Sequence, residues 1–405
     1  MGADGVYAGL HVLELGAGAA GPIATRYFAE QGATVLRVES SMRPDFLRML
    51  HARPGVPIDL DAAPTFALLN PDKWSVSINL QKPAGVELVR RLVDWADVVS
   101  QNFAPNAMEK LGLGAEALLA RKPGLVVVTS SLFGATGPHR DYPGFGGQGS
   151  AIAGFHHLTG WPDREAVGPA ATITDSLSPR YVAVLIAAAL LERRRSGRGV
   201  HIDVSQIETG VYSLSEAIVR TSATGESVVR AGNRQAGAAP HGVYPCAGDD
   251  AWIAITVFDD AEWQALVGAM GSPDWAQEAR FVTALGREAH QTELDRALAD
   301  WTRHHPAYAL QATLQAARVP AGVVQGVREL LRDPQLAHRR HFETLDHAAL
   351  GPLPYDRSGF RLSASPGGFD DSGPLLGEDN DVVLGRILGL SEAEIERLVA
   401  DEVIV

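Results

Sequence analysis

The chain has 405 residues, of which 46% are hydrophobic and 20% are charged, and 35 Lys and Arg against 48 Asp and Glu give a formal charge of −13. This apolar fraction supplies sizeable cores and excludes a mainly disordered chain. At roughly 150 residues per domain, the length predicts two or three domains. The acidity argues against a broad nucleic-acid-binding surface, which requires a basic face, so we expect no nucleic-acid partner.

The cysteine count and the hydropathy pattern set the expected environment. The single cysteine, Cys246, cannot close a disulfide within the chain, and no HExxH motif or cysteine cluster occurs, so we expect no metal site. Residues 1–10 lack the basic patch and the apolar run of a signal peptide. The longest apolar stretch, at 181–191, is shorter than the ~20 residues that a bilayer requires. We expect a buried helix there, no membrane contact and a reducing, cytoplasmic location.

Strand and helix patterns alternate along the first half of the chain. Gly32 ends a helical stretch that follows the first strand, and apolar residues recur with helical spacing at 84–96. Strands are expected at residues 11–15, 33–38, 75–80, 97–100, 125–129 and 200–204. Strands that alternate with helices at this spacing predict an α/β fold with a parallel, wound sheet.

A glycine- and proline-rich stretch interrupts this alternation. Residues 133–175 predict a loop with little regular structure. A long helix is expected after it, from 179 to 195. Ser178 suits the N-cap, Pro179 suits the first helical position, and the arginines at 193–195 suit the negative end of the helix dipole.

The pattern changes again near residue 225, which predicts a second domain. Its expected features are a flexible segment at 232–241, strands at 243–244 and 251–257, and helices at 262–270 and 292–302. The tail from about 338 returns to loop and strand and closes with an amphipathic helix at 391–400. We therefore predict a large domain at 1–224, a smaller α+β domain at 225–337 and a segment at 338–405 that returns to the large domain.

The most visible motif is the glycine-rich turn Gly16-Ala-Gly-Ala-Ala-Gly21. It follows a strand, opens a helix and precedes an acidic strand end, Glu39, by 18 positions, as in the dinucleotide-binding fingerprint. Such a turn lets a pyrophosphate approach the backbone at a helix N-terminus, which predicts an NAD- or FAD-dependent oxidoreductase. The alternative is a turn of small residues that only packs tightly. The residues alone leave both interpretations open.

A second candidate is Asp175, in the sequence Thr-Ile-Thr-Asp-Ser before the predicted helix. It can be a capping or turn aspartate. It can also be an ionised carboxylate near a helix N-terminus, with small neighbours that leave room for a substrate. Such a carboxylate is a competent nucleophile toward an activated acyl group.

Several longer segments, in a fixed order, carry a family resemblance. They are GLHVLELGAGAAGPIATRYFAEQGATVLRVE at 9–39, LNPDKWSVSINLQKPAG at 69–85, ADVVSQNFAPNAMEKLGL at 96–113, LERRRSGRGVHIDVSQIE at 191–208 and PLLGEDNDVVLGRILGLSEAEI at 374–395. Over essentially its whole length the chain resembles the family III CoA-transferases, which include formyl-CoA and carnitine CoA-transferases and are related to the α-methylacyl-CoA racemases. The resemblance implies a Rossmann-like large domain, a smaller domain and an interlocked dimer, either a homodimer or a heterodimer with a related chain.

The resemblance reassigns the glycine-rich turn to coenzyme A, a substrate, and implies no permanently bound cofactor. The matching CoA-contact positions are Ala19, Ala20, Ile78, Asn79, Leu80, Gln81, Asn102, Phe103 and Lys110. Gln81 stands where a lysine is common, and Ser40 stands where some members have a basic residue. Arg37, Arg43 or Lys73 would then supply the missing cations for the phosphates.

The family's catalytic aspartate corresponds to Asp175. The resemblance implies that its carboxylate attacks the thioester of a donor acyl-CoA and forms an aspartyl anhydride. An aspartyl-CoA thioester follows, from which CoA passes to an acceptor acid. Anhydrides hydrolyse, so the site must exclude water. The segment 235–241, which contains Gly237, corresponds to the family's mobile loop over the site.

Two residues in the loop that precedes Asp175 in the sequence depart from the family pattern. Phe145 and Gly146 stand where transferases often have Tyr and an acidic residue, and where racemases have His and Asp. The chain therefore lacks the acid/base group that epimerises an α-carbon, which argues against a racemase. The loop PGFGGQGSA is similar to the benzylsuccinate CoA-transferases, in which succinyl-CoA is the donor and an aromatic dicarboxylic acid the acceptor. We predict a CoA-transferase that acts on acyl-CoA and carboxylic acids. An oxidoreductase, a racemase and a non-catalytic partner subunit are the alternatives.

Overall fold

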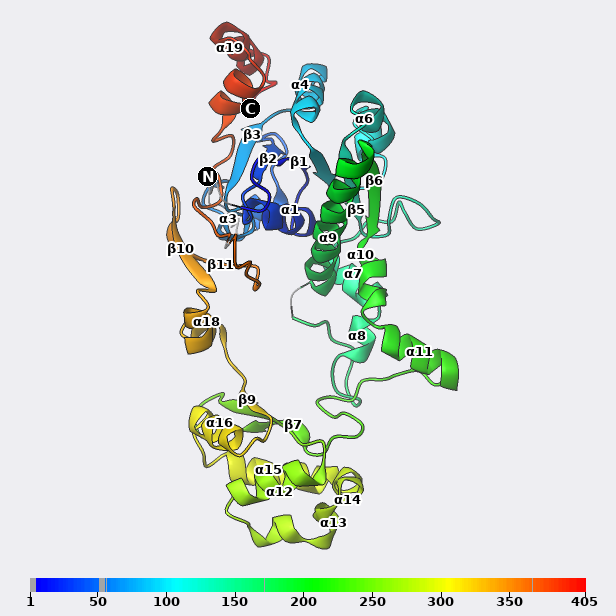
Figure 1. Ribbon diagram of the computed structural model, residues 1–405, viewed down its shortest axis with the longest axis vertical. Coiled ribbons are helices and arrows are strands. Elements are labelled where there is room, and N and C mark those ends of the chain that lie inside the picture. Colours follow the sequence, from blue (N-terminus) through cyan, green and yellow to red (C-terminus); the bar gives the residue numbers. More distant parts are fainter. Residues whose placement is uncertain (1–4, 51–54, 56, 171, 366) are drawn as a thin grey trace. The chain divides into compact units, whose positions relative to one another are not determined.

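The computed structural model describes residues 5–50, 55, 57–170, 172–365 and 367–405. The chain forms two compact units, whose elements are labelled in Figure 1. The first unit combines residues 1–156, 168–227 and 337–405. The second unit combines residues 157–167 and 228–336.

A parallel sheet of six strands forms the centre of the first unit, in the order β3-β2-β1-β4-β5-β6 (Figure 1). The strands are β1 (His11–Leu15), β2 (Thr34–Glu39), β3 (Lys73–Ser77), β4 (Val98–Gln101), β5 (Val126–Ser131) and β6 (Val200–Ser205). The strands β1 to β5 are almost wholly buried, as expected for parallel strands covered on both faces. This sheet confirms the predicted α/β fold, and the direction of winding reverses between β1 and β4.

Helices cover both faces of this sheet. On one face, α1 (Ala20–Ala29) and α9 (Ile173–Ser196) bury Phe28 against the valines of the strands. On the other face, α4 (Pro83–Trp95) and α6 (Ala115–Arg121) pack on the leucines. Successive side chains of a strand point to opposite faces, so one apolar strand can supply both cores.

Shorter elements complete the first unit and its boundaries. They are the helices α2 (Phe46–Met49), α3 (Pro64–Leu69), α5 (Ala107–Lys110), α7 (Gly146–Ile152), α8 (Phe155–Leu158), α10 (Gln206–Tyr212), α11 (Ser215–Thr224), α18 (Pro334–His338) and α19 (Glu392–Ala400), the π-helix η2 (Val382–Ile387), and the antiparallel strands β10 (Phe342–His347) and β11 (Gly351–Asp356).

The C-terminal segment lies along the edge strand β3. The Ser75 amide donates to Asp379 Oδ2 at 2.8 Å, and the Ser77 amide donates to Asn380 Oδ1 at 2.9 Å. An exposed strand edge is a template for unwanted pairing, and these bonds cover it. The tail is therefore part of the first unit.

Helix α9 begins earlier than the sequence predicts. Its N-cap is Thr172 rather than Ser178, so Pro179 lies inside the helix. Proline has no N–H and cannot donate to the carbonyl oxygen of Asp175, the residue one helical turn before it. Asp175 is therefore in the first turn of α9, not in a preceding loop, and the helical hydrogen bonding around it is incomplete.

The expectation of an irregular loop at 133–175 is wrong for the segments that form α7 and α8. Glycine has a low helix propensity, so the composition did not predict a helix. In α7, however, the glycines allow close packing: a Cβ on Gly149 would lie 2.7 Å from Leu132 Cδ1. Tertiary contacts override propensity here.

Among the described residues, α9 is the one helix whose length and apolar composition would allow it to cross a membrane. It is less buried than the sequence predicts for 181–191. Val182 and Ile186 lie in the core, whereas Val184 and Leu191 are exposed.

The second unit has an antiparallel sheet in the order β7-β8-β9, with strands β7 (His241–Pro245), β8 (Trp252–Thr256) and β9 (Ala321–Val323). Its helices are α12 (Asp260–Ala269), α13 (Ala279–Val282), α14 (Ala284–Ala289), α15 (Gln291–Thr302), α16 (Ala307–Ala316), α17 (Val327–Leu330) and the 3-10 helix η1 (Asp274–Gln277). The core forms around Trp263, which is fully buried.

Candidate active site

A cavity of about 680 Å³, here named the main pocket, opens at the carboxyl ends of the parallel strands. Four of its lining residues follow strands: Gly16 after β1, Ser40 after β2, Ile78 after β3 and Phe103 after β4. Open α/β sheets bind ligands in the crevice where the winding reverses. The main pocket lies in that crevice.

Residues predicted to contact CoA come together in the main pocket from separate segments. Those that line it are Arg43, Ile78, Asn79, Leu80, Gln81, Phe103 and Lys110. Asn102 lies directly behind its glycine-rich wall, whereas Ala19 and Ala20, at the start of α1, are not part of the lining.

The glycine-rich turn has its amides occupied by the protein itself. The Ala17 amide donates to Asn102 Oδ1 at 2.9 Å, and Asn102 Nδ2 donates back to the Ala17 carbonyl at 2.7 Å. The Gly18 amide donates to both carboxylate oxygens of Asp45, at 2.9 and 3.1 Å. A Cβ on Gly21 would lie 2.7 Å from Asn102 Oδ1, so the glycine is needed for this approach. Two amides of a dinucleotide-type turn are thus not free for a pyrophosphate.

The carboxylate of Glu39 is also hydrogen-bonded within the protein. Its buried carboxylate accepts from Arg48 Nε and Nη2, both at 2.9 Å, and from Ser75 Oγ at 2.8 Å. An acidic residue that binds a ribose must present its oxygens to the ligand. The geometry of the turn and of Glu39 therefore does not support the NAD or FAD hypothesis.

Lys73 is not part of the main pocket. Its ammonium is buried and donates to Glu14 Oε2, the Pro22 carbonyl and Thr25 Oγ1, each at 2.8 Å. Burial by itself raises the pKa of Glu14, but Lys73 and Arg37 outweigh it and lower this pKa to about 2. Arg37 also pairs with Glu14 and Asp45. Arg37 lines the main pocket but is almost fully buried, so we conclude that Lys73 and Arg37 belong to a buried ion cluster whose charges are already paired with carboxylates.

Two exposed cations remain at the main pocket. Arg43 and Lys110 both line it, and within the described residues neither forms an ion pair. A cation without a carboxylate partner can neutralise a phosphate without first breaking a salt bridge.

Asp175 faces α7. A Cβ on Gly146 would lie 2.8 Å from Asp175 Oδ1 and closer still to Oδ2, so only glycine fits at this position. Thr174 Oγ1 and Ser150 Oγ donate to the Gly146 carbonyl at 3.1 and 2.9 Å and fix the glycine in place. Burial raises the pKa of Asp175, and a hydrogen bond with the Thr172 side chain opposes that shift.

Two phenylalanines connect the main pocket to Asp175. Phe46 lines the pocket, and its ring meets that of Phe145 edge-on, with centroids 5.8 Å apart. Phe145 directly precedes Gly146, which touches the Asp175 carboxylate. The candidate CoA pocket and the candidate nucleophile thus form one continuous set of contacts.

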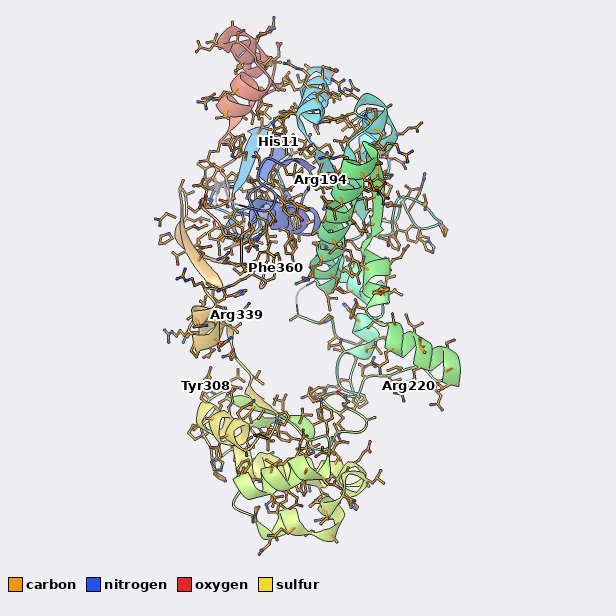
Figure 2. All side chains as sticks on the ribbon, viewed as in Figure 1. His11, Arg194, Arg220, Tyr308, Arg339 and Phe360 are labelled. Atoms are coloured by element: carbon orange, nitrogen blue, oxygen red, sulfur yellow. The ribbon has the colours of Figure 1, made fainter. Side chains whose placement is uncertain are left out.

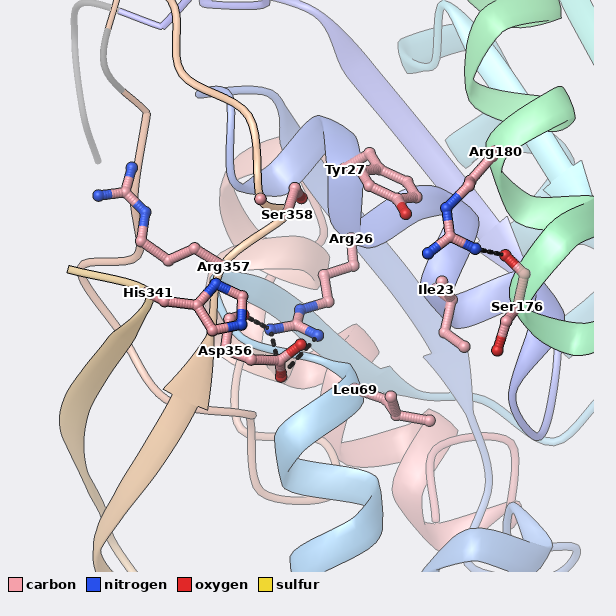
Figure 3. A pocket seen from close by; sticks show the side chains of 11 residues that line it. Ile23, Arg26, Tyr27, Leu69, Ser176, Arg180, His341, Asp356, Arg357 and Ser358 are labelled. Carbon is pink, nitrogen blue, oxygen red and sulfur yellow. Dashed lines mark hydrogen bonds and ion pairs between the residues drawn. The ribbon is translucent and has the colours of Figure 1, made fainter. Parts of the chain in front are cut away.

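A second cavity, of about 420 Å³, lies beside α9 (Figure 3). Ser176 and Arg180 of α9 line it together with Arg26 of α1. Arg180 donates to the Ser176 carbonyl, and Arg26 pairs with Asp356 of β11. None of the predicted site residues lines this cavity, and its contacts attach the β10–β11 hairpin to α1.

Gly237 lies in the second unit. It has a φ of +79°, and its amide donates to Glu288 Oε1 at 3.3 Å. The segment 235–241 is therefore hydrogen-bonded to α14 through Gly237 and Glu288.

Sequence reasoning missed Asp45 and Phe46. Asp45 is the N-cap of α2, and it accepts from the Leu47 amide at 2.9 Å. An aspartate before an apolar pair is a capping signal that could have marked this helix. Its bond to Gly18 could not be predicted, because it joins distant parts of the chain.

Comparisons with known proteins identify the family of the chain. The model of the family described as CoA-transferase family III matches residues 7–380. A succinyl-CoA–D-citramalate CoA-transferase from Chloroflexus aurantiacus is 38% identical, covering 98% of this chain and 97% of the relative. The β subunit of a succinyl-CoA–L-malate CoA-transferase from the same organism is 31% identical and covers 98% of both chains. A succinate–glutarate CoA-transferase from Agrobacterium fabrum is 30% identical and covers 94% and 95%.

Solved structures are also similar over nearly the whole chain. One of them is a CAIB/BAIF family protein from Brucella suis, with a TM-score of 0.87 at 29% identity. The alignment covers 95% of this chain and 100% of the other. These findings confirm the family resemblance seen in the sequence.

Proposed function

Because the chain belongs to CoA-transferase family III and is a CoA-transferase, we propose that it moves CoA from succinyl-CoA to a dicarboxylic acid, with Asp175 as the covalent nucleophile. The observation that carries this proposal is the contact path from the main pocket through Phe46 and Phe145 to the Asp175 carboxylate. The names of the three relatives pair succinyl-CoA or succinate with citramalate, malate or glutarate. All of these acids are dicarboxylic, which supports the proposed class of donor and acceptor.

In the proposed reaction, the Asp175 carboxylate attacks the thioester carbon of succinyl-CoA. The C–S bond breaks, CoA leaves as a thiolate, and a succinyl–aspartyl anhydride remains. The thiolate attacks the aspartyl carbonyl, which releases succinate and forms an aspartyl-CoA thioester. The acceptor carboxylate then attacks this thioester, giving a second anhydride and the thiolate. Attack of the thiolate on the acceptor carbonyl gives acceptor-CoA and restores Asp175. No step needs ATP, an external proton or an oxidant.

Partial burial suits this role for Asp175. A carboxylate that has lost part of its water shell is more basic, which the raised pKa expresses, and it is a stronger nucleophile while still ionised. Acylation removes the charge, so the intermediate does not carry the desolvation cost of the free carboxylate.

We assign CoA to the main pocket. Arg43 and Lys110 would contact its phosphates, and the segment 78–81, together with Phe103, would hold the remainder. Asn102 would support the pocket wall through Ala17. On the family resemblance alone, Ala19 and Ala20 stay proposed CoA contacts, and Gly237 stays a proposed part of the mobile loop.

Mass spectrometry of acyl exchange tests the function. Succinyl-CoA is offered with D-citramalate, L-malate, glutarate and benzylsuccinate, and a new acyl-CoA is expected with at least one of them. Asp175→Ala should abolish exchange, and the Asp175 peptide of the wild type should gain the mass of a hydroxamate after incubation with acyl-CoA and hydroxylamine. Exchange by Asp175→Ala at the wild-type rate would contradict the mechanism. Exchange with benzylsuccinate and with none of the other acids would identify the chain as a benzylsuccinate-type CoA-transferase.

The proposal also covers the oligomeric state of the protein and its location in the cell. We propose a dimer that acts in the cytoplasm; relatives named as α and β subunits of one transferase support an assembly of two chains. Light scattering on the purified chain tests the dimer. Exchange activity of that chain by itself would exclude a merely structural partner subunit, and absence of deuterium uptake at the α-carbon of acyl-CoA would exclude a racemase.

A further inference from the structure

The aromatic rings of Phe46 and Phe145 stand at the junction between the main pocket and Asp175. Both are exposed, Phe46 to 41% and Phe145 to 69%, although large apolar side chains gain free energy by burial. They meet each other edge-on at 66°, a favoured arrangement for aromatic pairs. Two paired rings are therefore left uncovered at this junction.

Phe46 is held in this position by buried polar groups. Asp45, the residue before it, accepts from the Leu47 and Gly18 amides and pairs with Arg37. The Phe46 ring also lies against the glycine-rich turn, where a Cβ on Gly18 would be 2.5 Å from Phe46 Cε1. The buried ion pair of Asp45 fixes the backbone next to Phe46, and the glycine-rich turn lies against the Phe46 ring. Together these contacts restrict the positions that the ring can take. A surface phenylalanine that serves only to fill space needs no such support.

We infer that Phe46 is a substrate-contacting residue which forms, with Phe145, an aromatic throat for the thioester end of acyl-CoA. The throat receives the arm of CoA between the main pocket and Asp175, and its rings cover the aspartyl anhydride. Water that reached the anhydride would add across the acyl C–O bond and give two free acids, so that the thioester energy would be lost. This inference rests on the proposed function, and it names the residues that separate transfer from hydrolysis.

The test uses Phe46→Ala, Phe145→Ala and the double variant of the full chain. Phe360 provides a matched control, since it is 44% exposed in the same unit and does not line the main pocket (Figure 2). Transfer is measured as new acyl-CoA by mass spectrometry. Hydrolysis is measured as free thiol that accumulates from succinyl-CoA when no acceptor is present.

Each throat variant should lower kcat/KM for succinyl-CoA about tenfold and raise the ratio of hydrolysis to transfer about fivefold. The loss in the double variant should be smaller than the product of the two single losses, because the rings act on one substrate segment. Phe46→Leu, which keeps an apolar side chain, should recover most of the transfer and serves if Phe46→Ala does not fold. Phe360→Ala should behave as the wild type in both assays.

The throat is wrong if Phe46→Ala and Phe46→Leu match Phe360→Ala in transfer and in hydrolysis while Asp175→Ala abolishes transfer. In that case the proposed function stands. Transfer by Asp175→Ala at the wild-type rate would instead overturn the covalent mechanism, and the throat with it.

Discussion

Gly146 and Asp175 are in such close contact that a single methyl group cannot be placed between them. A Cβ at Gly146 would lie 2.8 Å from Asp175 Oδ1 and closer to the other two atoms of the carboxyl group. The glycine belongs to α7 and the aspartate to α9, so the packing of two helices defines where the carboxylate points.

Gly146→Ala should therefore displace the nucleophile and leave the fold intact. A misplacement of about 1 Å at a reacting group costs about 100-fold in rate, so kcat for transfer should fall at least that far. Gly147→Ala is the matched control, because a Cβ there meets nothing within 4 Å. Equal rates for the two variants would show that Asp175 does not need this position.

Arg43→Ala and Lys110→Ala should each weaken the binding of acyl-CoA. The loss of one exposed cation from a phosphate costs about 1 kcal/mol, so KM should rise about fivefold with little change in kcat. The dependence of KM on salt should also become shallower. Arg361→Ala, which removes an exposed arginine outside the main pocket, should leave KM unchanged. If KM of the variant that carries both Arg43→Ala and Lys110→Ala still depended on salt as in the wild type, the phosphates would bind elsewhere.

Asn102→Ala tests the internal support of the glycine-rich turn. It removes both hydrogen bonds to Ala17 and leaves an amide unpaired, which should lower the free energy of unfolding by about 1–3 kcal/mol. The loosened turn should raise KM for acyl-CoA more than it lowers kcat. A variant with the wild-type melting temperature and KM would mean that the turn keeps its shape without this side chain.

Asp72 gives a prediction for the pH dependence of stability. Burial is the main cause that raises its pKa to about 7, and the charges of Asp370 and Asp371 add to it, while their backbone amides oppose it. The folded protein therefore holds a proton that the unfolded chain has already lost, and this contribution to stability disappears as the pH rises from about 4 through 7.

Asp72→Asn keeps a neutral side chain at every pH. Its melting temperature relative to the wild type should therefore be higher at about pH 8 than at about pH 4.5, by roughly 2–4 °C for each kcal/mol gained. Thermal scans of both proteins at the two pH values measure this difference. The same difference at both values would show that Asp72 does not titrate in this range.

The sheet could be predicted because its strands are short apolar runs separated by helices, as in the run that became β5. The meaning of the glycine-rich turn could not, because it depends on Asn102 and Asp45, which the fold brings to Ala17 and Gly18 from other segments. A dinucleotide-binding turn and this one look alike in sequence. They differ in what their amides bond to.

Several residues that line the main pocket could be named from the sequence, but their arrangement could not. Lys73 was expected at a phosphate, yet its sequence position after a loop gives no sign that Glu14 and Thr25 surround it. Phe46 was missed because an exposed phenylalanine is common on protein surfaces, and only the contact with Phe145 gives it meaning.

Pro179 gives the nucleophile a backbone that can move at low cost. The carbonyl oxygen of Asp175 has no amide one turn ahead to accept from, so a shift of this part of α9 breaks one helical hydrogen bond fewer than it would in an uninterrupted helix. In the proposed cycle the side chain of Asp175 changes from a small carboxylate to an anhydride and then to a bulky thioester. A rigid helix would resist each increase in size, whereas a turn with one bond fewer can adapt to all three forms and return.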